Sequence, residues 1–290
     1  MGFVNRLASF LTGRLDVHSR FDLERKAISG TMSNFYMARD SRSGQIVGLK
    51  ILDPQKTAQL EARFKGFKKL TEGQIAVRFA HPYIVKTYEH GLTTEGAQYL
   101  VMEFLEGPGM NSVLIARDDA LLDGRRVKFI RQAAEALAAV HLAGFIHRDV
   151  CPRNLIFTGD RETLKLTDFG LAVPATGPFL RPGNRTGTPD YMAPELARRR
   201  PTDKRLDVFA FGATAYEICT YELPWLRGIT GAAAMTHDQP AVDICRYRPQ
   251  IDPQLADAIH ACIDPDVNKR CPSMERFLYA IRNIKHEDGK

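Results

Sequence analysis

Cysteine is scarce in this sequence and follows no framework. The 290 residues include five cysteines, an odd number, and no two of them have the Cys-x-x-Cys spacing of zinc sites and redox motifs. The pattern therefore predicts neither a set of structural disulfides nor a zinc site. Unpaired thiols are typical of a reducing compartment, so we expect a cytoplasmic protein.

Long apolar runs are missing as well. No segment reaches the ~18 apolar residues of a membrane-spanning helix, and the sequence contains no internal repeat or low-complexity tract. With 44% apolar and 26% charged residues, the composition is that of an ordinary globular protein. The chain is long enough for one large core or for two lobes.

Basic residues outnumber acidic ones, which gives a formal net charge of +6. Lysine and arginine are scattered and are not interleaved with aromatic residues, so we expect no nucleic-acid partner. The densest basic cluster runs from Arg198 to Arg200. It could recognise acidic residues of a substrate, but solvated surface charge is the simpler interpretation.

Residues 1–20 form a separate amphipathic segment. Arg6 and Arg14 lie off an apolar helical stripe made of Phe3, Val4, Leu7, Phe10, Leu11 and Leu15. The segment lacks the cationic start and long apolar block of a secretory leader, and Arg6 does not fit the myristoylation pattern after Gly2. The stripe favours a helix packed on the rest of the chain, and a membrane surface or a regulatory partner is the alternative.

The pattern changes near Gly107-Pro108-Gly109. From Phe21 to this point, short β-rich runs separated by turn residues predict a small sheet, interrupted by one helical stretch at about residues 57–80. Beyond it, apolar residues recur with a helical period. We expect an α+β protein divided into the amphipathic segment 1–20, a β-rich lobe with one helix at 21–103, a hinge and a larger, mostly helical lobe at 104–285, and a C-terminal tail at 286–290.

The most informative stretch is His147-Arg148-Asp149-Val150-Cys151-Pro152-Arg153-Asn154, followed by Asp168-Phe169-Gly170. A loop Asp can accept a hydroxyl proton, while an Asn amide and a second Asp are hard oxygen ligands of the kind that Mg²⁺ uses beside phosphates. Because Asn154 stands five residues after Asp149, one short loop can direct both side chains inward. The pattern predicts phosphoryl transfer, which depends on metal binding, alignment and removal of a proton.

These motifs occur in the order found in protein kinases, and the chain resembles a eukaryotic-like (Hanks-type) serine/threonine protein kinase from about residue 21 to residue 285. The matching segments are Val47-Gly48-Leu49-Lys50, Glu72, His81-Pro82, the apolar run 99–105, the two motifs above, Gly187 to Glu195, Asp207 to Gly212, and Arg270. The resemblance implies a bilobal protein-kinase-like fold. It also implies ATP- and Mg²⁺-dependent phosphorylation of serine or threonine hydroxyls on protein substrates.

By this resemblance, Asp149 is the catalytic base, and Asn154 and Asp168 hold Mg²⁺. Lys50 reaches the α- and β-phosphates and is paired with Glu72, which we prefer over Glu61 because it stands nine residues before His81. Met102 borders the adenine site, and the backbone after it forms the hinge. The residues implied to bind ATP are Gly30, Ser33, Phe35, Gly48, Lys50, Met102, Glu103, Leu105 and Ile156.

The resemblance also implies supporting roles around this centre. His147 and Phe169 are expected to align the two catalytic aspartates by packing, not by relaying a proton. Glu195 and Arg270 are expected to form a buried ion pair. This pair would anchor the activation segment, the residues between Asp168 and Glu195.

Regulation is implied at Arg148, because an arginine before the catalytic Asp marks kinases whose activation segment is ordered by a phosphorylated residue. The hydroxyls available for this are those of Thr176 and Thr186. Thr188, within Gly-Thr-Pro, is expected instead to position the acceptor beside Asp149.

Two positions depart from the family pattern. Residues 28–33 keep only the middle glycine of Gly-x-Gly-x-x-Gly, Gly30, so we expect weaker ATP binding, with Ser33 as a small polar substitute. Cys151 stands where serine/threonine kinases usually carry a lysine that neutralises the γ-phosphate. We expect Arg153 to take that role.

The departures leave an alternative function open: a weakly active or inactive pseudokinase that acts as a nucleotide-binding or scaffold module. A tyrosine-directed kinase fits less well, because Gly187-Thr188-Pro189 and Tyr191 have the serine/threonine form. A small-molecule phosphotransferase would not be expected to carry the peptide-docking segment from Gly187 to Glu195. No sensor domain is evident, so we expect regulatory input from a partner.

Overall fold

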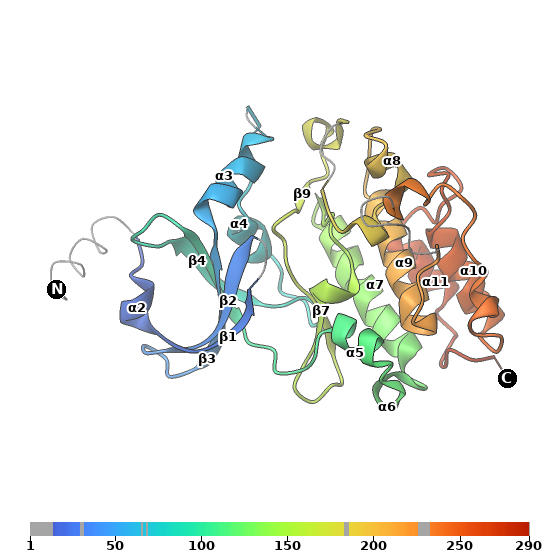
Figure 1. Ribbon diagram of the computed structural model, residues 1–290, viewed down its shortest axis with the longest axis horizontal. Coiled ribbons are helices and arrows are strands. Elements are labelled where there is room, and N and C mark those ends of the chain that lie inside the picture. Colours follow the sequence, from blue (N-terminus) through green and yellow to red (C-terminus); the bar gives the residue numbers. More distant parts are fainter. Residues whose placement is uncertain are drawn as a thin grey trace. The chain divides into compact units, whose positions relative to one another are not determined.

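The computed structural model describes residues 14–29, 32–64, 66–67, 69–182, 186–225 and 233–289. The chain divides into two compact units: a smaller unit of residues up to Ala80 together with Val85–Leu105, and a larger unit of His81–Ile84 together with residues from Glu106 onward. Figure 1 shows the elements of each unit. None of the helices in the described part of the chain is long and apolar enough to cross a membrane.

The smaller unit is built on a five-stranded antiparallel sheet with the order β1-β2-β3-β5-β4. The strands are β1 (Phe21–Ser29), β2 (Ser33–Asp40), β3 (Ile46–Leu52), β4 (Thr87–Leu92) and β5 (Gln98–Glu103). Residues of β3 face alternate sides of the sheet, as the period of a strand requires. Val47 and Leu49 therefore point into a buried apolar cluster, and Gly48 and Lys50 point to the opposite face.

The short helix α2 (Val17–Arg20) leads into β1 and packs on this cluster through Val17. Leu15 pairs with Thr93 and packs on the same cluster. The Arg20 guanidinium binds Asp40 at 2.8 Å and Glu89 at 2.9 Å. The remaining stripe residues, Phe3 to Leu11, lie outside the described residues, so the helix expected there stays a prediction.

The helical stretch expected at residues 57–80 is divided into two helices, α3 (Pro54–Ala62) and α4 (Glu72–Ala76). Gly66 lies between them with a φ of +88°, a backbone conformation that favours glycine. Thr71 then starts α4 with a reciprocal capping box: its hydroxyl accepts from the Gln74 backbone N–H, and the Gln74 side chain accepts from the Thr71 N–H.

The larger unit is mostly helical. Its helices are α5 (Met110–Ala116), α6 (Asp119–Leu122), α7 (Arg126–Leu142), α8 (Pro194–Ala197), α9 (Arg205–Thr220), α10 (Pro253–Cys262) and α11 (Met274–Ala280). Single 3₁₀ turns occur at Pro152–Asn154, Gly177–Leu180, Pro189–Tyr191, Ala233–Met235 and Ile244–Arg246. Two short ladders pair β6 (Phe145–Ile146) with β9 (Val173–Pro174) and β7 (Leu155–Phe157) with β8 (Leu164–Leu166).

Helix α9 forms the centre of this unit. Every residue from Leu206 to Thr220 is buried, because α7 and α10 both pack against the helix (Figure 1). A helix that is apolar on all sides is the expected form for such a position. A sheet-based unit and a helix-based unit together confirm the predicted α+β fold class.

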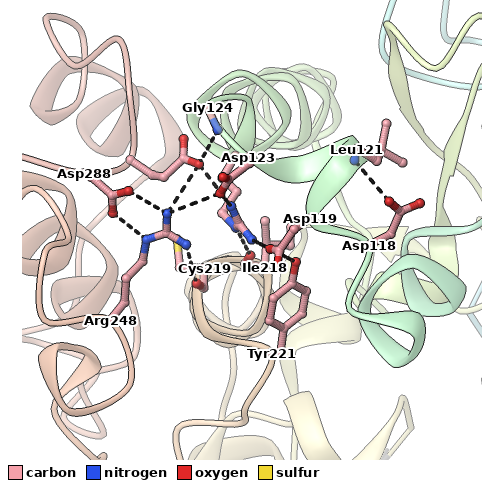
Figure 2. A network of polar contacts seen from close by, with 12 residues as sticks. Asp118, Asp119, Leu121, Asp123, Gly124, Ile218, Cys219, Tyr221, Arg248 and Asp288 are labelled. Carbon is pink, nitrogen blue, oxygen red and sulfur yellow. Dashed lines mark hydrogen bonds and ion pairs between the residues drawn. The ribbon is translucent and has the colours of Figure 1, made fainter.

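A polar network joins the start of α7 to the end of α9 and to the C-terminal residues (Figure 2). The side chain of Arg126 is 1% exposed, and all five of its N–H groups are used. They donate to the Ile218 carbonyl and to side-chain oxygens of Asp119, Asp123, Tyr221 and Glu287. An arginine can be buried here because its charge is neutralised and its donors are satisfied.

The same network holds the last described residues in place. Glu287 also accepts from the backbone N–H of Gly124 at 2.7 Å, and Arg248 binds Asp288 through Nε and Nη2 at 2.6 and 2.8 Å (Figure 2). Residues Glu287 and Asp288 of the expected C-terminal tail are therefore anchored on the larger unit.

Candidate active site

Lys50 and Glu72 form a buried ion pair in the smaller unit. The Lys50 Nζ lies 2.6 Å from Glu72 Oε1, and the two residues are 9% and 5% exposed. Glu72 is the first residue of α4, so the capping box at Thr71 fixes where its side chain starts. Glu61, the competing candidate, accepts from the side chain of Gln98 instead. The structure thus pairs Lys50 with the glutamate preferred from the sequence.

Three of the residues expected to bind ATP gather on the same face of the sheet as Lys50. A Cβ atom at Gly48 would lie 2.6 Å from Phe35 Cζ and 3.1 Å from Met102 Cγ, so only glycine lets these side chains meet there. Phe35 also stacks on Phe104, with ring centroids 6.4 Å apart. Phe104 was not singled out from the sequence, although it lies within the expected hinge.

Three of the remaining ATP-binding candidates of the smaller unit, Glu103, Leu105 and Ser33, can be placed in the fold. Glu103 ends β5, and it holds Lys86 through its backbone N–H and its side chain at 2.9 and 2.7 Å. Leu105 is half-buried, and Ser33 begins β2 opposite Leu52. Gly30 lies outside the described residues. The adenine and phosphate contacts of these residues stay predictions.

In the larger unit, a 3₁₀ turn at Pro152–Asn154 folds the loop back on itself, so that Asn154 meets Asp149. The Asn154 amide donates to the Asp149 carbonyl at 2.7 Å and to Oδ2 at 3.1 Å. Asp149 Oδ1 accepts from both the backbone N–H and the hydroxyl of Thr188, at 2.9 and 2.7 Å. Arg153 Nη2 donates to the same hydroxyl at 2.8 Å. The loop therefore places a carboxylate and a guanidinium on one threonine and an amide on that carboxylate.

Asp168 follows the second strand of the β7–β8 ladder, next to this loop. The ladder is extended by a hydrogen bond of 2.9 Å from the Thr167 N–H to the Asn154 carbonyl. Asp168 is the residue after Thr167, so the backbones of the two predicted metal ligands lie near each other. Asp168 has a φ of +65°, a strained conformation for a non-glycine residue. Its Oδ1 accepts from the Gly170 N–H at 3.1 Å. Ile156, the ATP-binding candidate of this unit, lies within β7 and pairs with Lys165.

Asn154 and Asp168 suit magnesium by the chemistry of their donor atoms. The Asn154 nitrogen is used within the loop, which leaves the amide oxygen available to a metal ion. Within the described chain, no group of three His, Cys, Asp or Glu side chains could hold a metal unaided. Mg²⁺ commonly binds through one or two protein oxygens together with substrate phosphates, so two ligands are sufficient here.

Asp207 supports the loop from within the core and was not assigned a role from the sequence. Its carboxylate is fully buried and accepts from the backbone N–H groups of His147 and Arg148 at 2.7 and 2.8 Å, and from His141 Nε2 at 2.9 Å. Burial alone would raise the pKa of Asp207, but the hydrogen bonds from His141 and from the backbone N–H of His147 keep this pKa below its usual value. A carboxylate among the apolar residues near the start of a buried helix is the sequence signal that could have indicated this role.

His147 packs as the resemblance implies. The residue is fully buried, and its ring lies edge-on to Phe169 with centroids 5.1 Å apart. Nδ1 accepts from the Asp149 backbone N–H at 3.3 Å, and Nε2 donates to the Thr167 carbonyl at 3.1 Å. Because backbone groups use both ring nitrogens, His147 positions the loop and does not contact the Asp149 carboxylate.

Arg148 is buried without enough partners. It is 4% exposed, and only Nη2 donates, to the Phe179 carbonyl at 2.8 Å. Within the described chain, Nε and Nη1 have no hydrogen-bond partner, and burial lowers the pKa of the guanidinium. Thr186 is half-buried and lines a small cavity together with Arg148, whereas Thr176 is exposed.

The end of the activation segment is fixed by two pairs of side chains. Arg270 binds Glu195 through two hydrogen bonds of 2.7 and 3.0 Å, so the expected ion pair is present. The Tyr191 hydroxyl donates to Glu217 on α9 at 2.5 Å, a contact that the sequence did not suggest. Burial next to Glu217 raises the pKa of Tyr191, so this phenol stays protonated and remains a donor.

Cys151 fills the position of the usual lysine without replacing its charge. The residue is fully buried, and its sulfur lies 3.7 Å from the Thr188 hydroxyl oxygen, whose proton is donated to Asp149. Burial raises the pKa of the thiol to about 11, so it is neutral at physiological pH. The cation nearest to Thr188 is therefore supplied by Arg153.

Comparison with known proteins gives a single family. The protein kinase domain model matches residues 21–279. A probable serine/threonine-protein kinase of Clostridium acetobutylicum is 29% identical over 270 residues, covering 92% of this chain and 40% of the relative. Pkn3 of Myxococcus xanthus is 31% identical, covering 89% and 48%, and PknA of Mycobacterium tuberculosis is 32% identical, covering 92% and 61%.

The chain thus spans between 40% and 61% of the length of these relatives. The domain match extends over nearly all of the region in which the sequence motifs occur, and the relatives are named as serine/threonine-protein kinases. The chain therefore belongs to the protein kinase family, as its motifs predicted, and these relatives are named as serine/threonine-protein kinases.

Proposed function

We propose that this chain is a catalytically active kinase that transfers the γ-phosphoryl group of ATP to serine or threonine hydroxyls of protein substrates. The observation that carries the proposal is the hydrogen bond of 2.7 Å from the Thr188 hydroxyl to Asp149 Oδ1. It is a contact between the proposed base and an alcohol of the kind that a substrate would present. Geometry of this sort is the first requirement of a general base.

In this mechanism Asp149 accepts the hydroxyl proton, while Asn154 keeps its carboxylate oriented through the amide. Thr188 positions the acceptor side chain. Arg153 places a positive charge next to Thr188. Arg153 thereby does the work of the lysine that Cys151 replaces. A fixed cation at this point stabilises the charge that develops on the transferring group.

Lys50 would bind the phosphates, and Glu72 holds the ammonium group in position at 2.6 Å. Asn154 and Asp168 would hold Mg²⁺. When bound, MgATP supplies the phosphoryl group and the charge neutralisation that phosphoryl transfer requires. The names of the relatives support serine and threonine as the acceptors.

The test is phosphate mapping with a matched pair of variants. The chain is incubated with MgATP and a generic protein substrate, and phosphorylated residues are identified by mass spectrometry. Asp149→Asn should lower the transfer rate by about 10²- to 10⁴-fold, the contribution usual for a general base. Asp160→Asn, which changes an exposed aspartate of the same unit, should leave the rate unchanged. Transfer that survives undiminished in Asp149→Asn would contradict the proposal.

The second candidate function is a pseudokinase that binds nucleotide with little or no turnover. The observation that favours it is the neutral, buried Cys151 in place of a cation. Calorimetry of ATP binding, combined with the phosphate mapping above, separates the two candidates. ATP binding without phosphate on the chain or on substrates would support the pseudokinase, whereas phosphate on Ser or Thr that disappears with Asp149→Asn would exclude it.

A further inference from the structure

Cys262 and Cys271 lie next to each other in the larger unit, away from the proposed catalytic residues. Cys262 ends α10, and Cys271 precedes the N-cap of α11 by two residues. The backbone N–H of Cys271 donates to the carbonyl of Ala261 at 2.8 Å. The Cys271 thiol donates a hydrogen bond to the Ser273 carbonyl at 3.3 Å, and each of the two cysteines shifts the pKa of the other.

The backbone spacing at this point is compatible with a disulfide. Bonded cysteines have Cα atoms ~4.4–6.8 Å apart, and backbone segments joined by a direct N–H···O=C bond, as these are beside Ala261, have that spacing. All five cysteines are free thiols in the structure, and Cys245 is the exposed one among them.

We propose that Cys262 and Cys271 form a redox-sensitive pair that is joined by a disulfide when the protein meets a hydroperoxide. The bond closes the segment 262–271, which also carries Arg270. Since Arg270 binds Glu195 at 2.7 Å, the cross-link forms one residue away from the ion pair that anchors the activation segment.

The electron and proton balance of this step is complete with hydrogen peroxide as the oxidant. The Cys271 thiolate attacks one peroxide oxygen, the O–O bond breaks, and the products are a Cys271 sulfenic acid and, after proton uptake, water. The Cys262 sulfur then attacks the sulfenic sulfur. The S–S bond forms, the S–O bond breaks, and the hydroxide takes the Cys262 proton and leaves as a second water. Two electrons pass from the sulfur atoms to the peroxide.

The two cysteines differ in a way that sets this order. The hydrogen bond from Cys262 lowers the pKa of Cys271 to about 7, so Cys271 has a substantial thiolate fraction at neutral pH. Cys262 is fully buried, and its pKa lies well above the ordinary value because of that burial. Cys271 is 8% exposed and is therefore the one a small oxidant reaches first. Cys262 then acts as the resolving thiol.

The experiment is peptide mapping of the full chain. The reduced protein, freed of reductant, is treated with hydrogen peroxide, digested without reduction, and mapped by mass spectrometry. We expect a cross-linked peptide pair containing Cys262 and Cys271, lighter by two hydrogen atoms than the separate peptides and released by dithiothreitol. Because the readout is a covalent bond, it is independent of kinase activity.

Two variants sharpen the result. Cys245→Ser removes the exposed thiol and should leave the cross-link unchanged, which serves as the matched control. Cys262→Ser should abolish the cross-link and cause Cys271 to accumulate as sulfenic and then sulfinic acid. The proposal is overturned if, in the wild-type chain, Cys271 is oxidised to sulfinic acid while Cys262 remains a thiol. It is equally overturned if both thiols stay reduced after Cys245 has reacted completely.

Discussion

At the scale of single residues, Arg148 is the side chain whose surroundings are least complete. Its guanidinium is buried, and two of its three nitrogen atoms have no hydrogen-bond partner in the described structure. A buried charge whose donors are not hydrogen-bonded is costly. Its backbone N–H is held by Asp207, so the residue cannot easily move away. A phosphate on a nearby threonine would give these nitrogens hydrogen-bond acceptors and would bring a negative charge next to the guanidinium.

We therefore predict that phosphorylation of Thr176 or Thr186 activates the chain. Whichever of the two is modified, its replacement by Ala should lower the rate of substrate phosphorylation by about 10-fold or more, since the phosphate adds charge-assisted hydrogen bonds to Arg148. Thr94→Ala, at an exposed threonine of the smaller unit, is the control. Rates are measured after phosphosite mapping. Full activity in the Thr176→Ala/Thr186→Ala double variant would contradict the prediction.

Arg153 gives a second prediction at this scale. Arg153→Ala should lower kcat by about 10- to 100-fold, as expected for loss of a cation that stabilises developing charge. Arg153→Lys should recover part of the loss, because it restores the charge without the planar guanidinium. Cys151→Ser, which exchanges one neutral side chain for another, should change kcat little. Steady-state kinetics that show equal rates for Arg153→Ala and the wild type would assign the charge elsewhere.

At the scale of elements, α4 has only five residues and depends on its capping box. So short a helix has little stability of its own, and its position is set by the cap and by packing. Because Glu72 is the first residue of α4, the cap also sets the position of the Lys50 ion pair. We therefore expect stability and the proposed ATP binding to be coupled through Thr71.

Thr71→Ala should lower the free energy of unfolding by about 1 kcal/mol, the usual cost of losing an N-cap. It should also raise the KM for ATP, because Glu72 no longer holds Lys50 as firmly. Thr71→Ser keeps the hydroxyl and should preserve both properties. Urea denaturation and ATP titration measure the two effects. A change in stability without any change in KM would show that the cap and the ion pair are independent.

At the scale of the whole molecule, one buried and one half-buried histidine make stability depend on pH. Burial lowers the pKa of His237 and of His260 below the ordinary value. His237 is 2% exposed, donates to the Met192 carbonyl at 2.7 Å and stacks on Trp225. These residues are neutral when folded, whereas in the unfolded chain they gain a proton below pH ~6.5. The unfolded state therefore binds more protons in that range.

The free energy of unfolding should consequently decrease as the pH falls from about 7.5 to about 5.5. Carboxylates with lowered pKa values, such as Asp207, titrate outside this window and contribute at lower pH. Urea denaturation at several pH values measures the trend, and His237→Gln should reduce its slope. A free energy of unfolding that is constant over the window would show that these histidines do not titrate on unfolding.

The features that the sequence determined by itself are local ones. The alternation of Val47, Gly48, Leu49 and Lys50 specifies a strand with one apolar and one functional face, and the structure has this arrangement. The spacing of Asp149 and Asn154 specifies a loop that folds back on itself, and the two side chains meet. Such features can be predicted from the sequence because strand period and loop length are properties of neighbouring residues. The catalytic and ATP-binding roles assigned to these residues remain predictions.

Tertiary structure alone decided the contacts between distant segments. Asp207 meets His147 across 60 positions of the chain, and Arg126 meets Glu287 across 161. The helical stretch at 57–80 was divided by a cap and a glycine turn that hydrophobic periodicity does not record. The meeting of Cys262 with Cys271 likewise depends on how α10 and the chain before α11 pack. A residue pattern encodes period and spacing, whereas the pairing of remote side chains follows from burying the whole core at once.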